Sequence, residues 1–166
     1  YRAADGAVHA TTLARDLGRV FGDDQVFLDK DDLRGGSHWI DEVGRALDAR
    51  PVLLLLVTPA LFGATDAAGR RRIDDPRDPI RVEVAGALAA GATLIPLLAD
   101  GVDALPGDLP PPLDSLAVRT WRRLRAYDWE RDLHRIVDDL LALGVAAAGA
   151  RPVSGAGARG RGAAIG

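Results

Sequence analysis

Hydrophobic positions along the chain follow two spacings, one typical of amphipathic helices and the other typical of buried strands. Residues 10–21 carry apolar side chains at intervals of three and four, which predicts a helix that ends before Gly22. The apolar run 26–28 predicts a short strand, and residues 39–47 return to the helical spacing. The first part of the chain is therefore predicted to form a helix, a strand and a second helix.

The middle of the chain carries the strongest strand pattern. Residues 52–57 are all apolar without alternation, which indicates a strand covered on both faces, as in a parallel sheet. Residues 80–90 predict a helix that ends at Gly91, the position of a left-handed cap. A second buried strand is predicted over 93–98, where Pro96 lacks an N–H and therefore favours an edge or a strand end.

The last part of the chain adds one weak strand and one helix. A short edge strand is predicted over 116–121 and an amphipathic helix over 130–143. Strands that alternate with helices predict an α/β fold with a parallel sheet between helix layers. From Gly144 the chain is rich in Ala, Gly and Arg, so the domain is assigned to 1–143 and a flexible linker to 144–166.

Composition narrows the function classes. The chain is 48% hydrophobic and 27% charged, which is typical of a globular domain, and its net charge of −3 gives no electrostatic reason to expect a nucleic-acid partner. It has no cysteine and three scattered histidines, so neither a redox centre nor a metal site is predicted. No apolar run reaches the roughly 18 residues of a membrane span and no signal sequence is visible, which predicts no membrane partner and a cytoplasmic location.

Parallel α/β domains host many functions, so specific residues must distinguish among them. The glycine-rich phosphate-binding patterns of dinucleotide-binding and P-loop domains are absent. A receiver domain would have an aspartate after the third strand and a lysine after the fifth, whereas Thr58 and Pro59 follow the third and the only lysine, Lys30, follows the second. A receiver-like regulatory domain is therefore the weakest alternative.

Four segments stand out in order along the chain: Tyr1-Arg2 as the end of a first strand, 26–39 as a second strand and its long loop, 52–61 as a third strand and its sequel, and 81–97 as a helix with an internal glutamate followed by a strand. In this order they resemble motifs of the Toll/interleukin-1 receptor (TIR) family, in particular its bacterial members. The resemblance covers roughly residues 1–143. It implies a flavodoxin-like three-layer fold with a five-stranded parallel sheet in the order 2-1-3-4-5.

The resemblance places the first strand at the centre of the sheet, yet that strand is largely missing from this chain, which begins at Tyr1. Removing a central strand leaves its neighbours without hydrogen-bond partners. The isolated chain is therefore predicted to be unstable unless another segment fills the gap.

The resemblance also implies a TIR-domain signalling and assembly module that acts by homotypic protein–protein interaction. The loop after the second strand is the expected interaction surface, with candidate residues Asp29, Asp32, Leu33, Arg34, Gly35 and Gly36. The expected partners are other TIR domains, with a homo-oligomer formed on activation, and no cofactor is expected.

TIR domains that are enzymes cleave the nicotinamide–ribose bond of NAD⁺, so an active NAD⁺ glycohydrolase or cyclase of a bacterial defence system is the alternative function. Glu83 matches the family's catalytic glutamate, whose carboxylate would stabilise the ribosyl cation. Tyr1, Arg2 and Trp39 are the candidate substrate-binding residues, through phosphate or ribose contacts and ring stacking. Pro79 stands where these enzymes tend to carry tryptophan.

Structural roles stay open for several of these residues. Glu83 can be favoured early in a helix by the helix dipole and can pair with arginines, and Trp39 can face the core. The acidic group Asp74, Asp75 and Asp78 can bind a metal or form a turn ahead of a helix, and its Asp-Asp-Pro sequence favours the turn.

Overall fold

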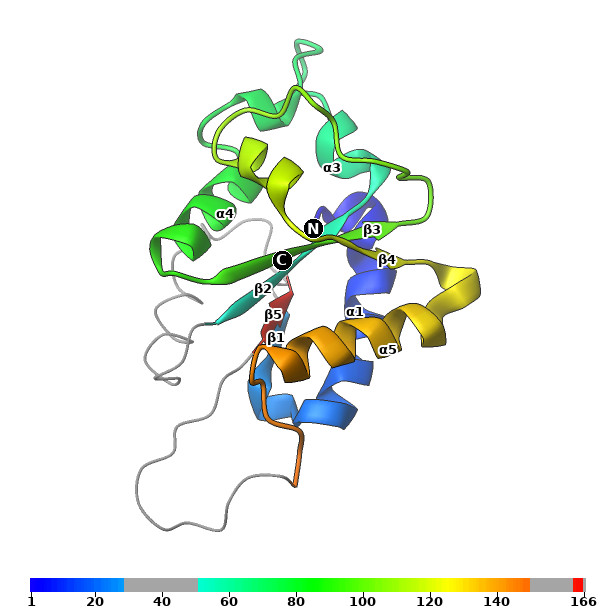
Figure 1. The fold of residues 1–166 in the computed structure, drawn as a ribbon. Helices are drawn as coiled ribbons and strands as arrows, with labels where there is room; N and C mark the ends of the chain where they lie inside the picture. Colours follow the sequence, from blue (N-terminus) through cyan, green and yellow to red (C-terminus); the bar gives the residue numbers. More distant parts are fainter. Residues whose placement is uncertain (29–50, 150–162, 166) are drawn as a thin grey trace.

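A five-stranded, all-parallel sheet forms the centre of the molecule, with helices on both faces (Figure 1). The structure is a computed structural model, and it describes residues 1–28, 51–149 and 163–165. The strand order is β1-β5-β2-β3-β4. The predicted α/β fold of the flavodoxin-like type is confirmed.

Strands β2 (Val52–Val57) and β3 (Thr93–Ala99) form the most extensive pair in the sheet. They are paired from Val52 opposite Thr93 to Val57 opposite Leu98, and every residue of β2 is buried. The run without alternation at 52–57 is explained by this position, because helices cover both faces of β2. Both strand predictions are confirmed, and β3 extends one residue further than expected.

The place that the first strand was expected to take is filled by the C-terminal strand β5 (Ala163–Ile165). It lies between β2 and strand β1 (Val26–Leu28) and pairs in parallel with both. The expected order 2-1-3-4-5 is therefore reproduced, with β5 in the central position. The prediction of a linker over 144–166 is wrong for these three residues, because a small, apolar segment fits a narrow slot between two parallel strands.

The side chains on the two faces of the sheet form separate cores. On one face, helices α1 (Ala3–Phe21) and α5 (Trp129–Ala142) pack against the sheet, which we call the α1/α5 core. On the other face, α3 (Pro59–Gly63) and α4 (Pro79–Ala89) form the α3/α4 core. The three-layer arrangement follows from these two cores, and Figure 1 shows the helix pairs on opposite sides of the sheet.

Helix α1 begins at Ala3, earlier than the predicted start at residue 10. Its first two turns bury no large apolar side chain, since Val8 is 77% exposed, which is why the hydrophobic spacing did not reveal them. The buried face nevertheless continues through Gly6 and Ala10, four residues apart.

The helix predicted over 80–90 is α4, and Gly91 adopts a positive φ of 74°, so the left-handed cap is confirmed.

The edge strand lies later in the chain than predicted. Leu113–Val118 forms a 3₁₀ helix, whereas the edge strand β4 is Arg122–Leu124, paired with Leu97–Ala99 of β3. Leu113 and Leu116 are both buried, and their spacing of three suits a 3₁₀ turn better than a strand. The prediction of a strand over 116–121 is therefore wrong. The observed edge strand β4 contains two arginines and so lacks an apolar run, and it is held in place by its pairing with β3.

Pro96 lies in the middle of an inner strand and not at an edge or a strand end, which corrects the prediction. Thr93 donates its N–H to Pro51 O, so the backbone groups of alternate residues of β3 point toward β2, and those of Pro96 point to the other side. On that side β4 begins only opposite Leu97. The missing N–H of Pro96 therefore costs the described sheet no hydrogen bond.

Short 3₁₀ helices connect several of these elements, and they cover Asp23–Gln25, Arg72–Asp74 and Ala126–Asp128. The helix predicted over 130–143 is confirmed by α5, which differs by one residue at each end. The helix predicted over 39–47 lies outside the described residues. Among the described residues, no helix has both the length and the apolar character needed to cross a membrane.

Candidate functional site

Three helix N-termini converge at the carboxyl edge of the sheet, and their polar residues form the candidate site. Arg2 precedes α1, Thr58 precedes α3 and Asp78 precedes α4, while Asp5 lies in the first turn of α1. We call Arg2, Asp5, Thr58 and Asp78 the carboxyl-edge cluster. In parallel α/β sheets, ligands bind outside this edge of the strands.

The centre of the cluster is a buried ion pair between Arg2 and Asp78. Arg2 Nη2 donates to Asp78 Oδ2 at 3.0 Å, and the two side chains are 5% and 1% exposed. Arg2 Nε also donates to Leu61 O at 3.0 Å. The arginine thus joins the start of α1 to α3 and α4, three elements that are far apart in the sequence.

Asp78 is also the N-cap of α4. Its Oδ1 accepts the N–H of Ile80 at 3.1 Å, which satisfies one of the free donors of the first helical turn. Arg72 adds a longer contact, with its Nε 3.7 Å from Asp78 Oδ2. The carboxylate therefore combines helix capping with charge pairing.

Asp5 links α1 to the start of α3. Its Oδ1 accepts the Thr58 hydroxyl at 2.6 Å, and its Oδ2 accepts the N–H of Ala60 at 2.8 Å. Thr58 is 2% exposed. The side chain of Thr58 makes no capping bond at the start of α3. The carboxylate of Asp5, which belongs to α1, therefore caps α3 in its place.

A polar cavity of about 510 Å³ adjoins the cluster and includes Asp78 in its lining. The remaining lining comes from residues 66, 70–72, 74–77 and 79. The charged groups of this lining largely pair with one another: Arg70 with Asp66, Arg71 with Asp74 and Arg77 with Asp75, at 2.8, 2.9 and 3.2 Å. The cavity therefore presents paired charges and not a concentrated positive or negative potential.

The acidic segment ahead of α4 forms the predicted turn. Asp74 ends a 3₁₀ helix, Asp75 accepts the N–H of Arg77 at 2.9 Å, and Asp78 begins α4. Hydrogen bonds from the Arg77 side chain and then its backbone hold the pKa of Asp75 below its usual value. Within the described residues, no group of three or more potential metal ligands is brought together, and the turn accounts for these aspartates.

Glu83 lies on α4, five residues after the N-cap Asp78, which is roughly 7.5 Å along the helix axis. The residue is 5% exposed. It shares a helix face with Ile80 and Ala87, which are three and four residues away and belong to the α3/α4 core. The predicted catalytic carboxylate is thus buried below the carboxyl edge of the sheet.

The structure describes some of the predicted site residues and leaves others outside the described ranges. Tyr1 is half-buried before α1, Arg2 pairs with Asp78 at the N-terminus of α4, and Glu83 lies five residues further along α4. Trp39 and the six interaction-loop residues lie outside the described residues, so their predicted roles are untested. The predicted contact of Arg2 with substrate is untested as well, whereas its observed bonds are to protein groups.

Sequence reasoning missed Asp5, Thr58 and the pairing of Asp78. A signal existed for Asp78, because an aspartate before Pro79 is typical of a helix N-cap followed by proline at the first helical position. For Asp5 no local signal was available, because its partner Thr58 lies 53 residues away.

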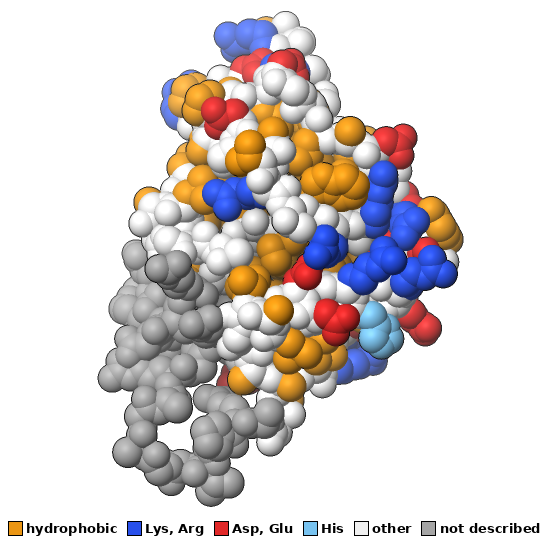
Figure 2. All heavy atoms as spheres, viewed as in Figure 1, with side chains coloured by type: hydrophobic (Ala, Val, Ile, Leu, Met, Phe, Trp, Pro, Cys, Tyr) orange, Lys and Arg blue, Asp and Glu red, His pale blue; other side chains and the backbone are white. Residues whose placement is uncertain are grey.

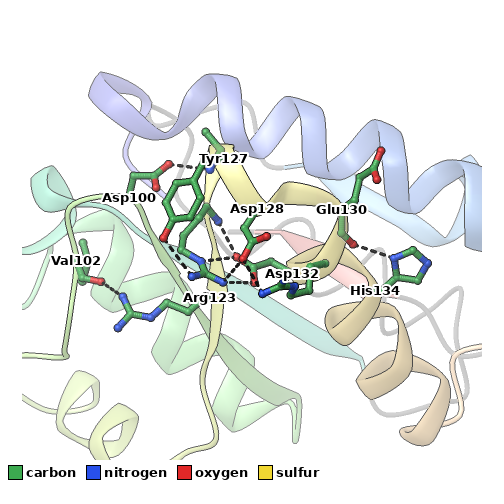
Figure 3. A network of polar contacts seen from close by, with 11 residues as sticks. Asp100, Val102, Arg123, Tyr127, Asp128, Glu130, Asp132 and His134 are labelled. Atoms are coloured by element: carbon green, nitrogen blue, oxygen red, sulfur yellow. Dashed lines mark hydrogen bonds and ion pairs between the residues drawn. The ribbon is translucent and has the colours of Figure 1, made fainter.

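A second polar network joins β4 to α5 (Figure 3). Asp132 is 1% exposed and accepts two bonds from the Arg125 guanidinium, at 2.8 Å each, together with the Arg125 N–H at 3.1 Å. These interactions, led by the side-chain bond, lower the pKa of Asp132. Figure 3 shows Tyr127 and Asp128 beside this pair, and Figure 2 shows basic side chains gathered on this part of the surface. The network fastens Arg125, the residue that follows β4, to the last helix.

Comparison with known proteins adds no further constraint on function. No family model matches the chain, and no curated protein matches it with significant similarity. The fold by itself is compatible with many functions. The functional argument therefore rests on the residues of this chain and on where the structure places them.

Proposed function

We propose that the chain is a TIR-type signalling and assembly module that acts by homotypic interaction. The observation that carries the proposal is the order of its four motifs together with the elements they occupy. Tyr1-Arg2 leads into α1, 26–28 is a strand, 52–61 is a strand followed by a short helix, and 81–97 is a helix followed by a strand. A sheet in the order expected for the family supports the same assignment.

In this proposal the loop after β1 makes the contact between copies. Its residues Asp29, Asp32, Leu33, Arg34, Gly35 and Gly36 combine charge, one apolar side chain and two glycines. Charged residues at the rim of an interface control association rate and partner choice, whereas an apolar residue contributes buried area. Leu33 is therefore the residue of this loop whose replacement tests assembly most directly.

A second activity, cleavage of NAD⁺, is supported by the resemblance of Glu83 to the family's catalytic glutamate. Glu83 lies on α4, the helix whose N-terminus is at the carboxyl edge of the sheet. In the proposed reaction, water replaces nicotinamide at the ribose, which gives nicotinamide, ADP-ribose and one proton. Glu83 would stabilise the positive charge that develops on the ribose as the bond to nicotinamide breaks.

The test is nicotinamide release from NAD⁺, measured by chromatography at low and high protein concentration. Glu83→Gln keeps the size of the side chain and removes the charge, and it is expected to lower the rate by about 100-fold or more. Glu130→Gln is the matched control, because Glu130 is exposed on α5, and it is expected to retain the parent rate. The folded state of each variant is checked by circular dichroism.

Assembly is measured separately by light scattering over the same concentration range. Leu33→Asp is expected to reduce self-association while Glu83→Gln leaves it unchanged. If Leu33→Asp associates as the parent does, the loop contact is wrong. If the parent releases no nicotinamide even when it is associated, NAD⁺ cleavage is rejected and the assembly proposal stands alone.

A further inference from the structure

Strand β5 occupies a slot at the interior of the sheet. Its residues Ala163, Ala164 and Ile165 are 1%, 3% and 1% exposed. Each lies opposite one residue of β1 and one of β2, from Val26 and Val52 at the first position onward. The segment thus completes two parallel ladders at once.

Both hydrophobic cores depend on this segment. Ala163 and Ile165 belong to the α1/α5 core, and Ala164 belongs to the α3/α4 core on the opposite face. Without β5, the backbone of β1 would face that of β2 across the width of a missing strand. A folded chain therefore requires an occupant in this slot.

The chain before β5 is anchored close to the point where the strand starts. Ala148 donates its N–H to Val20 O at 2.8 Å, and the Gln25 side chain donates to Ala146 O at 3.1 Å. Gln25 directly precedes Val26, which lies opposite Ala163. The chain thus leaves the described structure and enters the slot at the same edge of the sheet.

The connection from Gly149 to Ala163 is far longer than this short path needs. Its 14 residue steps could span roughly 46–50 Å when extended. Because β5 runs parallel to both neighbours, no tight turn ties it to either of them. The tether can consequently deliver the strand to another molecule without changing any contact inside the slot.

We propose that the slot between β1 and β2 is a strand-accepting site that takes Ala163–Ile165 from a second copy of this chain. The exchanged pair keeps all ladder and core contacts, so the free-energy difference from the single chain arises from the tether and the association. A tether of this length presents its own strand at an effective concentration of about 1 mM, so exchange becomes substantial when copies are crowded to that level. This mode of association is separate from the loop contact proposed above and does not require NAD⁺ cleavage.

Engineered cysteines provide a direct test, because the natural chain contains none. One copy of the chain carries Val26→Cys and another carries Ala163→Cys, positions that lie opposite each other in neighbouring strands. Adjacent strands place such residues within disulfide range. When the two chains are mixed, only strand exchange brings the two sulfurs into register, so the initial rate of heterodimer formation reports exchange.

Two matched chains complete the experiment. The doubly substituted chain reports whether β5 fills the slot of its own molecule. Val8→Cys, exposed at 77% on α1, replaces Val26→Cys in a control mixture that reports random collision. At about 1 mM protein the test mixture is expected to form heterodimer about tenfold or more faster than this control. Circular dichroism verifies that every variant is folded.

Each other outcome overturns the proposal. If the doubly substituted chain closes within itself while the test mixture stays at the control rate, β5 serves only its own molecule. If folded chains form neither disulfide, a different segment fills the slot. Association through the loop is recognised by light scattering without accelerated heterodimer formation, so failure of the exchange proposal does not affect the proposed function.

Discussion

The Arg2–Asp78 pair allows the architecture of the carboxyl edge to be tested through stability. Asp78→Asn removes the charge but keeps the helix cap, since asparagine caps helices about as well as aspartate. The loss of unfolding free energy caused by Asp78→Asn therefore measures the contribution of the ion pair itself. Arg2→Met removes the other partner while retaining much of the apolar stem.

The expected magnitudes follow from what each substitution leaves behind. Asp78→Asn leaves a buried guanidinium whose remaining described acceptor is Leu61 O, and breaking such a pair costs about 3–5 kcal/mol. Arg2→Met leaves Asp78 with the Ile80 N–H and with Arg72, whose side chain is 45% exposed and can approach from 3.7 Å. Its cost is expected near the lower end of that range, about 3 kcal/mol.

Urea unfolding followed by circular dichroism at pH 7 measures these changes. With a slope of about 2 kcal/mol per molar, a loss of about 3 kcal/mol moves the midpoint down by roughly 1.5 M. The double variant should cost less than the sum of the single variants by at least about 1 kcal/mol, because neither charge is then left alone. Asp75→Asn is the control: because its pair with Arg77 is exposed and screened by solvent, this substitution should leave the unfolding midpoint nearly unchanged.

Two results would refute this reasoning. Asp78→Asn could unfold within about 0.5 kcal/mol of the parent, as expected for a surface substitution. Alternatively, the effects of Arg2→Met and Asp78→Asn could be additive. Either result would mean that the two side chains do not interact and that α1 does not begin against α4.

Three further substitutions test other parts of the structure by the same unfolding measurement. Ile165→Ala should lower the free energy of unfolding by about 3 kcal/mol if β5 is part of the sheet. Val118→Ala, at an 89% exposed position, is the control, and a loss for Ile165→Ala no larger than that of this control would contradict the placement of β5. Asp132→Asn should destabilise the fold most at neutral pH, because Arg125 lowers the pKa of the folded carboxyl. The difference in unfolding free energy between this variant and the parent should shrink as the pH falls below 3.8, and a difference that stays constant with pH would contradict the reasoning. Asp5→Ala should cost about 1 kcal/mol through the lost cap of α3, and no change would argue against that cap.

The elements that sequence could predict are those whose signal is local. The strand at 52–57 and the helices at 80–90 and 130–143 carry their own hydrophobic pattern, and the structure places them within one residue of the predicted bounds. Each of them buries a face that its own sequence defines. Local pattern and tertiary position agree, so prediction succeeds.

Strands β4 and β5 could not be predicted because their neighbours determine them. Arg122–Leu124 is polar, and it is a strand because Leu97–Ala99 offers an unpaired edge. Ala163–Ile165 is short and follows a Gly-rich stretch, yet it pairs with residues more than 100 positions earlier in the chain. Neither segment shows a periodic pattern, so only the assembled sheet assigns their conformation.

The candidate site shows the same division between local and long-range information. The turn ahead of α4 was predictable, since Asp74, Asp75 and Asp78 form local bonds and a cap. The partner of Asp78 was not predictable, because Arg2 lies 76 residues away. The sequence therefore identified Arg2 as a candidate site residue through the family resemblance. Its observed role depends on the contact with Asp78, which only the fold creates.

The slot and the carboxyl-edge cluster are mechanically connected through β2. Strand β5 pairs with the first half of β2, ending where Ile165 lies opposite Leu54. Further along β2, Leu56 approaches Gly6, where an added Cβ would lie 3.5 Å from Leu56 Cδ2 and 3.0 Å from Tyr1 Cδ2. The start of α1, with Arg2, thus packs directly beyond the end of β5. Whatever strand occupies the slot supports the segment that holds Arg2 against Asp78, so the candidate site depends on a filled slot and not on which copy of the chain supplies the strand.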